Sequence, residues 1–224
     1  EDDIVMIGDE MIHGAEWHEL MGSPRVKSRG TGWGFGSQTI GDITAGIPAI
    51  FSSGKSPSRI FIHAGTGEVA RGESAQTIAD KMRTLLSAVK AAAPSSKLYL
   101  LSVQPIYPNH QKITDRSELD SRLRKLASEF GARYIDISSP LEKGRTDGLV
   151  RGNFVFGKGY LKIARILSGE MGLNPVPVMF QTRQTAFTGR GNRGETLVTL
   201  TVSPEKKEKL REVQVSLEAD AADV

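Results

Sequence analysis

Four short apolar segments, each ended by turn residues, are the feature that most restricts the fold of this chain. They are rich in Ile, Val, Leu or Tyr, and they cover residues 4–7, 59–63, 97–103 and 133–137. Apolar runs of this length are typical of strands buried on both faces. The segments between them carry apolar residues at helical spacing. This alternation predicts βαβ units and a mostly parallel sheet covered by helices on both faces.

Three of the intervening segments have the periodicity of amphipathic helices. They cover residues 74–93, 117–130 and 159–170. The apolar stripe of the second ends just before Gly131, and glycine is the residue that most often follows the last turn of a helix. These predicted helices and the four predicted strands all lie within the first 172 residues.

The character of the sequence changes near residue 172. Residues 174–177 read Asn-Pro-Val-Pro, and two prolines hold such a segment extended. Three β-like stretches follow, and they cover residues 178–187, 197–202 and 213–217. We therefore predict one domain over residues 1–172, and a linker with a partial β-domain over residues 173–224.

Composition excludes several classes of protein. A formal net charge of +3 over 224 residues, without a basic stripe carrying interleaved aromatics, argues against a nucleic-acid partner. No apolar run approaches the roughly 20 residues of a membrane span. The chain has no cysteine, so it forms no disulfide. No motif predicts a bound cofactor or a metal centre.

Four short sequence blocks carry the residues that indicate a functional site. They lie at the ends of predicted strands and at the start of one predicted helix. The first strand runs into Gly8-Asp9-Glu10, a sharp turn before a helix. Later blocks read Gly65-Thr66-Gly67-Glu68, Ser102-Val103-Gln104-Pro105 and Gly157-Lys158-Gly159-Tyr160. Open α/β folds bind ligands at the carboxyl edge of the sheet. We therefore expect these segments to form one site.

The order and spacing of these blocks resemble the SGNH (GDSL-type) hydrolase family over residues 4–170. That family has a Gly-Asp-Ser elbow, an oxyanion glycine, a Gly-Thr-Asn-Asp block, a Ser-Val-x-Pro strand and an Asp-x-x-His block before Gly-Tyr. The framework residues that agree include Asp9, Arg29, Gly30, Gly65, Thr66, Ser102, Pro105, Asp136, Gly159 and Tyr160. The resemblance implies a three-layer α/β/α sandwich, and ester hydrolysis as the activity of the family.

Departures from the family pattern fall on the residues that carry its chemistry. The nucleophilic Ser maps to Glu10, whose carboxylate is not the hydroxyl nucleophile of an acyl-transfer triad. The oxyanion-hole Asn maps to Gly67, which has no side-chain donor. The orienting Asp maps to Arg151, and the general base maps to Phe154, which accepts no proton. The resemblance therefore implies a hydrolase-like domain without acyl transfer.

The acidic residues leave alternatives open. Asp9 is expected to bond backbone amides near the elbow. Glu10 and Glu68 could bind a cation or act together as the carboxylate pair of a hydrolase. The interpretation that we favour is an ion pair between Glu10 and Arg151 across the former site.

An active esterase or carbohydrate deacetylase with a displaced site is a further alternative. His13 and His18 follow the elbow, and one of them would then replace the missing base. His63 ends a buried strand, and a histidine there is more often a core residue than a base.

Aromatic residues near the expected site edge suggest a sugar ligand, because aromatic rings stack on sugar rings. Trp33 and Phe35 lie in a Gly-Trp-Gly-Phe-Gly stretch that suits a binding loop. Phe154 either stacks on a sugar or fills the cavity that the triad vacates. Gly32 or Gly41 holds the position of the oxyanion glycine. The expected ligand-binding residues are Asp9, Glu10, Gly32, Trp33, Phe35, Gly41, Glu68, Arg151 and Phe154.

The segment after residue 172 weakly resembles the β-domain that precedes the propeller in some secreted bacterial sialidases, although no sialidase catalytic residue can be placed. The chain also begins at Glu1 rather than Met, which fits a trimmed or mature form that has lost an export signal. The sequence thus predicts a carbohydrate-binding or structural module of a larger exported glycan-degrading protein. Its expected ligand is a glycan or acylated sugar, its expected location is extracytoplasmic, and further domains are expected after Val224.

Overall fold

The computed structural model describes most of the first 173 residues and three later strands. The described residues are 3–30, 38–54, 56–106, 114–142, 149–151, 154–155, 157–173, 178–182, 195–202 and 215–218. The chain folds as two compact units, Glu1–Pro175 and Val176–Val224.

A five-stranded parallel sheet forms the centre of the first unit, in the order β2-β1-β3-β4-β5. Its strands are β1 (Ile4–Gly8), β2 (Val26–Gly30), β3 (Arg59–His63), β4 (Lys97–Leu101) and β5 (Arg133–Ile135). Four of them fall on the predicted apolar segments. The prediction missed β2, because this edge strand buries Val26 but places exposed or half-buried polar residues after it.

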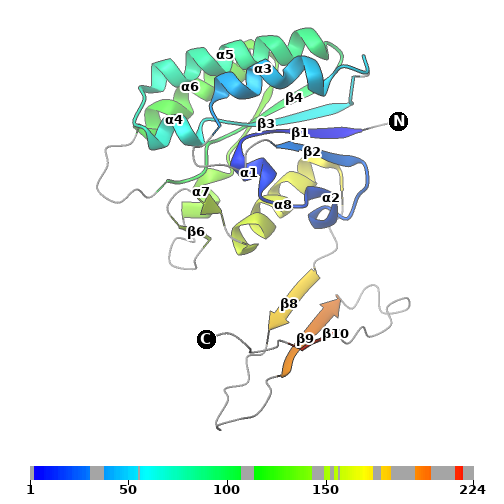
Figure 1. Ribbon diagram of the computed structural model, residues 1–224. Coiled ribbons are helices and arrows are strands. Elements are labelled where there is room, and N and C mark those ends of the chain that lie inside the picture. The colour runs from blue at the N-terminus through cyan, green and yellow to red at the C-terminus, as the bar shows by residue number, and fades with distance from the viewer. Residues whose placement is uncertain are drawn as a thin grey trace. The chain divides into compact units, whose positions relative to one another are not determined.

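Helices cover both faces of the sheet, which confirms the predicted α/β fold (Figure 1). The longer ones are α3 (Ile40–Ile50), α5 (Ala75–Ala92), α6 (Arg116–Glu129) and α8 (Gly157–Met171). The shorter ones are α1 (Glu10–His13), α2 (Trp17–Leu20), α4 (Thr66–Ala70) and α7 (Ser138–Glu142). A small hairpin of β6 (Val150–Arg151) and β7 (Phe154–Val155) precedes α8.

Two apolar clusters hold the layers together, one on each face of the sheet. Alternation along β3 assigns Ile60 and Ile62 to the cluster under α3, α5 and α6, and Phe61 to the cluster under α8. Phe61 stacks on Tyr99 of the neighbouring strand, with ring centroids 4.3 Å apart. Burial on both faces therefore explains why the central strands are continuous apolar runs.

Local capping explains where the long helices begin. Thr39 and Asp42 form a reciprocal capping box at the start of α3. Ser74 and Asp115 cap α5 and α6 by accepting a bond from a backbone N–H of the first turn. Gly131, just after α6, has φ +63°, as its position in the sequence predicts. The prediction missed α3, whose Pro48 and two glycines are poor helix formers.

The second unit contains an antiparallel sheet in the order β10-β9-β8. Its strands are β8 (Val178–Thr182), β9 (Glu195–Val202) and β10 (Val215–Glu218). Each overlaps one of the three β-like stretches in the sequence.

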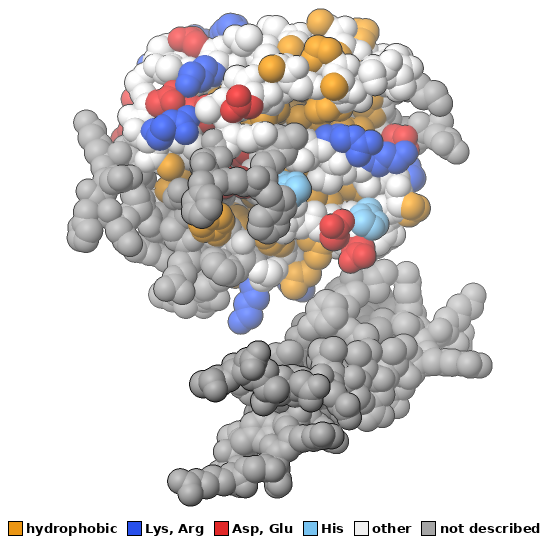
Figure 2. All heavy atoms as spheres, in the orientation of Figure 1, with side chains coloured by type: hydrophobic (Ala, Val, Ile, Leu, Met, Phe, Trp, Pro, Cys, Tyr) orange, Lys and Arg blue, Asp and Glu red, His pale blue; other side chains and the backbone are white. Residues whose placement is uncertain are grey.

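Charges of both signs are mixed over the face of the first unit that Figure 2 displays. Within the described ranges, no helix is long and apolar enough to cross a membrane.

Candidate functional site

The turns that follow β1 and β3 lie at the carboxyl edge of the sheet, where α1 and α4 begin (Figure 1). These two strands are neighbours, and Gly8 at the end of β1 is the register partner of His63 at the end of β3. Gly65 makes the sharp turn into α4 with φ +111°, a conformation that favours glycine. The topology therefore brings two of the predicted motifs together.

Asp9 is a fully buried carboxylate that joins these two turns. It accepts hydrogen bonds from the backbone N–H groups of Met11 and Thr66, each at 3.2 Å, and its Oδ1 lies 2.9 Å from Nδ1 of His63. Burial alone would raise the pKa of Asp9, but the charge and hydrogen bond of His63 and the bonds from Thr66 lower it below its ordinary value. The expected backbone bonds of Asp9 are present.

His63 is also fully buried, and its Nε2 has no hydrogen-bond partner. The Asp9 carboxylate orients the ring through Nδ1, as a carboxylate orients the histidine of a catalytic triad. The ring is 0% exposed, however, so a substrate does not reach it in this structure. His63 is placed as the core histidine that the sequence favoured.

Glu10 is the first residue of α1 and is half-buried. No hydrogen bond or ion pair joins its carboxylate to another residue in the described part of the chain. Burial raises the pKa of Glu10, and the neighbouring Asp9 raises it further. The predicted partner, Arg151, lies in β6, but its side chain is outside the described residues, so the ion pair stays a prediction.

Glu68 is a fully buried carboxylate on α4, and it holds the start of α3. Its Oε1 accepts a hydrogen bond from the backbone N–H of Ile40 at 2.9 Å. Arg71 and Lys81 lie 3.6 and 3.8 Å from the same oxygen, while Oε2 has no partner. Sequence reasoning missed this contact because it joins residues 28 positions apart.

The glycines predicted for the oxyanion hole have different surroundings. Gly67 is buried in the first turn of α4, where it offers no side-chain donor. Gly41 is exposed in the first turn of α3. Gly32, Trp33 and Phe35 lie outside the described residues.

Phe154 stands out among the described residues because its large apolar side chain is 62% exposed. It is the register partner of Arg151 in the β6–β7 hairpin, so the two positions that the sequence resemblance assigns to an Asp-x-x-His block lie side by side. This exposure argues against the interpretation that Phe154 fills a vacated cavity.

Trp17 and Tyr160 form an aromatic pair beside α1. Trp17 is fully buried and donates from Nε1 to the carbonyl of Ile12 at 2.7 Å, so it is a core residue. The edge of one ring faces the other, with centroids 5.8 Å apart. Burial raises the pKa of Tyr160 to about 12, with Asp9 and Glu10 contributing through their charges.

Two histidines were candidates for a replacement base. His13 is half-buried in the last turn of α1. His18 is exposed on α2, and its Nδ1 lies 3.6 Å from Glu16. Their assignment to catalysis stays a prediction.

A second polar network, which the sequence did not predict as a unit, fixes the ends of β4 and β5. Ser102 accepts hydrogen bonds from the backbone N–H groups of Ile137 and Ser138, each at 3.0 Å. Asp136 accepts bonds from Ser138 and Ser139. Thr66 donates to Gln104 at 3.1 Å and so connects the turn after β3 to the segment after β4.

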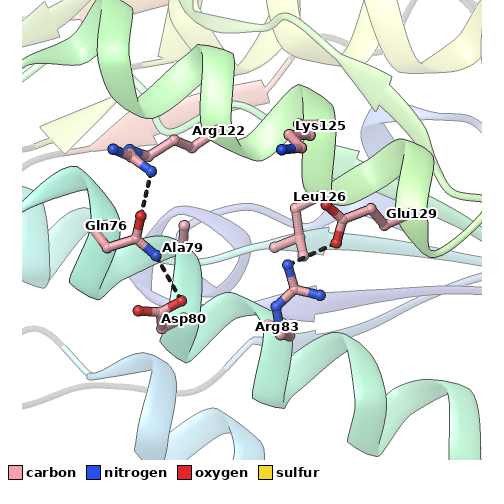
Figure 3. Close-up of a pocket in the computed structure, with 8 residues that line it drawn as sticks. All are labelled: Gln76, Ala79, Asp80, Arg83, Arg122, Lys125, Leu126 and Glu129. Atoms are coloured by element: carbon pink, nitrogen blue, oxygen red, sulfur yellow. Dashed lines mark hydrogen bonds and ion pairs between the residues drawn. The ribbon is translucent and has the colours of Figure 1, made fainter.

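A hollow lies between α5 and α6 (Figure 3). It is lined by Gln76, Ala79, Asp80, Arg83, Arg122, Lys125, Leu126 and Glu129. Arg83 is paired with Glu129 at 2.7 Å, and Arg122 donates to Gln76. Within the described residues, no group of three or more His, Asp or Glu side chains is arranged to hold a metal ion.

Comparison with known proteins shows the class of fold. No protein-family model matches the chain. No curated protein matches its sequence. Solved structures do match, and the first unit has the α/β fold of GDSL-like lipases and acylhydrolases.

Three of these structures illustrate the likeness. A GDSL-like lipase from Bacteroides thetaiotaomicron is 18% identical, covers 76% of this chain and 88% of its own, and has a TM-score of 0.59. A member of the lipolytic G-D-S-L family from Veillonella parvula is 16% identical, with coverages of 75% and 96% and a TM-score of 0.56. The psychrotrophic esterase EstA from Pseudoalteromonas is 15% identical, with coverages of 77% and 95% and a TM-score of 0.55.

Proposed function

We propose that the first unit is a GDSL-hydrolase-like domain that has lost acyl transfer and binds carbohydrate at the carboxyl edge of its sheet. The observation that carries the proposal is the 62% exposure of Phe154 at the position where the resembling family keeps its base. An exposed aromatic face is the kind of surface on which a sugar ring stacks.

The residues at the family's catalytic positions support the loss of acyl transfer. Glu10 follows the elbow where a hydroxyl nucleophile would stand, and Phe154 accepts no proton. The described histidine that is oriented by a carboxylate, His63, is enclosed in the core. These features favour binding over ester hydrolysis with a displaced site.

Glu10 and Glu68 are less well suited to act as a carboxylate pair. Both carboxyl groups of such a hydrolase must reach the substrate. Glu68 is 0% exposed, and its Oε1 is committed to Ile40, Arg71 and Lys81. We propose that the domain belongs to a larger exported glycan-degrading protein, in line with the weak sialidase-like character of the tail.

Two assays on the full chain test this function. Hydrolysis of p-nitrophenyl acetate is expected to stay at the buffer rate for the wild type, for Glu10→Ala and for Glu10→Ser, which restores a hydroxyl without a base. Affinity electrophoresis through gels containing soluble glucan, galactan, mannan or xylan is expected to show retardation by at least one polysaccharide.

Phe154 variants link the second assay to the site. Phe154→Ala is expected to lose the retardation, whereas Phe154→Trp retains an aromatic face and is expected to keep it. Ester turnover by the wild type would contradict the proposal. Wild-type mobility that none of the polysaccharides changes would contradict it equally.

A further inference from the structure

Gly14 leaves an open position on α1, and the hydroxyl group of Tyr160 fills it. A Cβ atom on Gly14 would lie 2.2 Å from Oη of Tyr160. Gly14 is exposed and Tyr160 is half-buried, which places this hydroxyl near the surface of the unit. The ring of Tyr160 is held behind it by the buried Trp17, with the two planes at 78°. The position of the hydroxyl is therefore fixed by packing.

Glu10 lies one helical turn before Gly14. The N–H of Gly14 donates to the carbonyl of Glu10 at 2.8 Å, which closes the turn of α1. Residues four apart on a helix project from the same face, with Cβ positions roughly 5–6 Å apart. Because Tyr160 Oη fills the Cβ position of Gly14, the Glu10 side chain and this hydroxyl are neighbours on one face of α1.

No hydrogen bond joins the Glu10 carboxylate or the Tyr160 hydroxyl to another residue in the described part of the chain. Asp9, by contrast, is saturated by Met11, Thr66 and His63. The edge of the sheet therefore presents one carboxylate acceptor and one phenol donor. Oxygen–oxygen hydrogen bonds are about 2.7 Å long, so one bridging oxygen joins groups roughly 5 Å apart.

We propose that Glu10 and Tyr160 recognise a hydroxyl group of the carbohydrate, which donates to the carboxylate and accepts from the phenol. This inference rests on the proposed binding function and deepens it by naming the polar contacts. A sugar hydroxyl is both a donor and an acceptor, so it satisfies both groups at once. The Tyr160 pKa of about 12 keeps the phenol a donor throughout the physiological range.

Affinity electrophoresis through the same glucan, galactan, mannan and xylan gels tests the pair. Glu10→Gln and Tyr160→Phe keep the shape of each side chain. Each is expected to weaken the retardation about tenfold or more, as loss of a hydrogen bond to a charged or buried group predicts. Glu19→Gln, on an exposed position of α2, and Tyr99→Phe, on β4, are matched controls that are expected to bind like the wild type.

The outcomes separate the two proposals. Wild-type protein that no polysaccharide retards contradicts the binding function itself. Retardation that Phe154→Ala abolishes but Glu10→Gln and Tyr160→Phe leave unchanged preserves that function and overturns the hydroxyl-recognising pair. Thermal melts followed by circular dichroism show whether each variant is folded, and Gly14→Ala supplies a further test. Its methyl group displaces the Tyr160 hydroxyl, so it is expected to weaken retardation like Tyr160→Phe.

Discussion

The Asp9 carboxylate lies 2.9 Å from Nδ1 of His63, and neither side chain is exposed. Asp9 also accepts bonds from the backbone N–H groups of Met11 and Thr66. One side chain thus joins the turn after β1 to the turn after β3, which are the two turns that shape the candidate site. Its removal would leave three buried donors without an acceptor.

Asp9→Asn removes the negative charge and replaces one acceptor oxygen by an NH2 donor, so it is expected to lower the free energy of unfolding by about 3–5 kcal/mol, the range found when a buried ion pair is broken. Urea denaturation at pH 7 measures the change. Asp80→Asn, on the exposed surface of α5, is the control and is expected to stay within about 0.5 kcal/mol of the wild type. Equal effects of the two substitutions would contradict a structural role for the Asp9–His63 pair.

The same pair predicts how stability depends on acid. The pKa of Asp9 is lower in the folded chain than the ordinary value of about 3.9 in the unfolded chain. Its contribution is therefore complete above the unfolded pKa and is lost as the pH falls through the folded pKa. Urea denaturation between about pH 6 and 3 is expected to show that the free energy of unfolding falls more steeply with decreasing pH for the wild type than for Asp9→Asn. The pKa of Asp136 is also lowered in the folded chain, so both proteins are expected to lose some stability in acid.

Glu68 is predicted to stabilise the start of α3. Glu68→Ala leaves the N–H of Ile40 without its acceptor, so the expected loss is about 1.5–3 kcal/mol of unfolding free energy. Glu68→Gln retains an oxygen acceptor but loses the ion pairs with Arg71 and Lys81, so its loss is expected to be smaller. Urea denaturation measures the free energy of unfolding of both variants. A larger loss for Glu68→Gln than for Glu68→Ala would exclude the role of Glu68 in holding the start of α3.

Two glycines of α8 are predicted to respond in opposite directions to alanine. A Cβ on Gly159 would lie 2.5 Å from the carbonyl oxygen of Leu149 and 2.7 Å from Val155, so Gly159→Ala is expected to cost about 1–3 kcal/mol. Gly169 has nothing within 4 Å of that position, so Gly169→Ala is expected to stabilise by about 0.5–1 kcal/mol. Thermal melts compare them, and a stable Gly159→Ala protein would refute the close packing of the hairpin on α8.

The ionisation of Tyr160 is predicted to depend on Glu10. The phenol is titrated by spectrophotometry, and the curve of Tyr160→Phe is subtracted from that of the wild type. The difference is expected to give a pKa of about 12 for Tyr160. Glu10→Gln removes a negative charge that disfavours the phenolate, so the pKa is expected to fall. Glu19→Gln serves as the control, and an unchanged pKa in Glu10→Gln would contradict the proximity of the two groups.

Several strands could be predicted from the sequence because each central strand is buried on both faces. In β3, every residue after Arg59 is buried, and the predicted segment of residues 59–63 coincides with the strand. The edge strand β2 was not predicted because it has one buried apolar residue followed by polar, more exposed ones. Helix α3 was not predicted because glycine and proline interrupt its helix-forming residues. The resemblance to a hydrolase family placed Asp9 and Glu10 at a turn, and the structure has them there.

The contacts of the candidate site could not be predicted in the same way. Glu68 bonds to Ile40 across 28 residues, and His63 bonds to Asp9 across 54. Nothing in the local sequence distinguishes a buried, bonded carboxylate such as Glu68 from a half-buried one such as Glu10, which has no partner among the described residues. The exposure of Phe154 and the position of the Tyr160 hydroxyl over Gly14 depend likewise on packing between distant elements.

The class of fold and the order of the motifs can be inferred from the chain alone, because hydrophobic periodicity and turn residues act over a few neighbouring positions. Packing in three dimensions sets which polar groups are enclosed and which stay at the surface. That choice depends on the register of β1 against β3 and on the packing of α8 against α1 and α2. Both bring together residues that are far apart along the chain, so the contacts of Asp9, Glu10, His63 and Tyr160 exist only once the sheet and its helices have assembled.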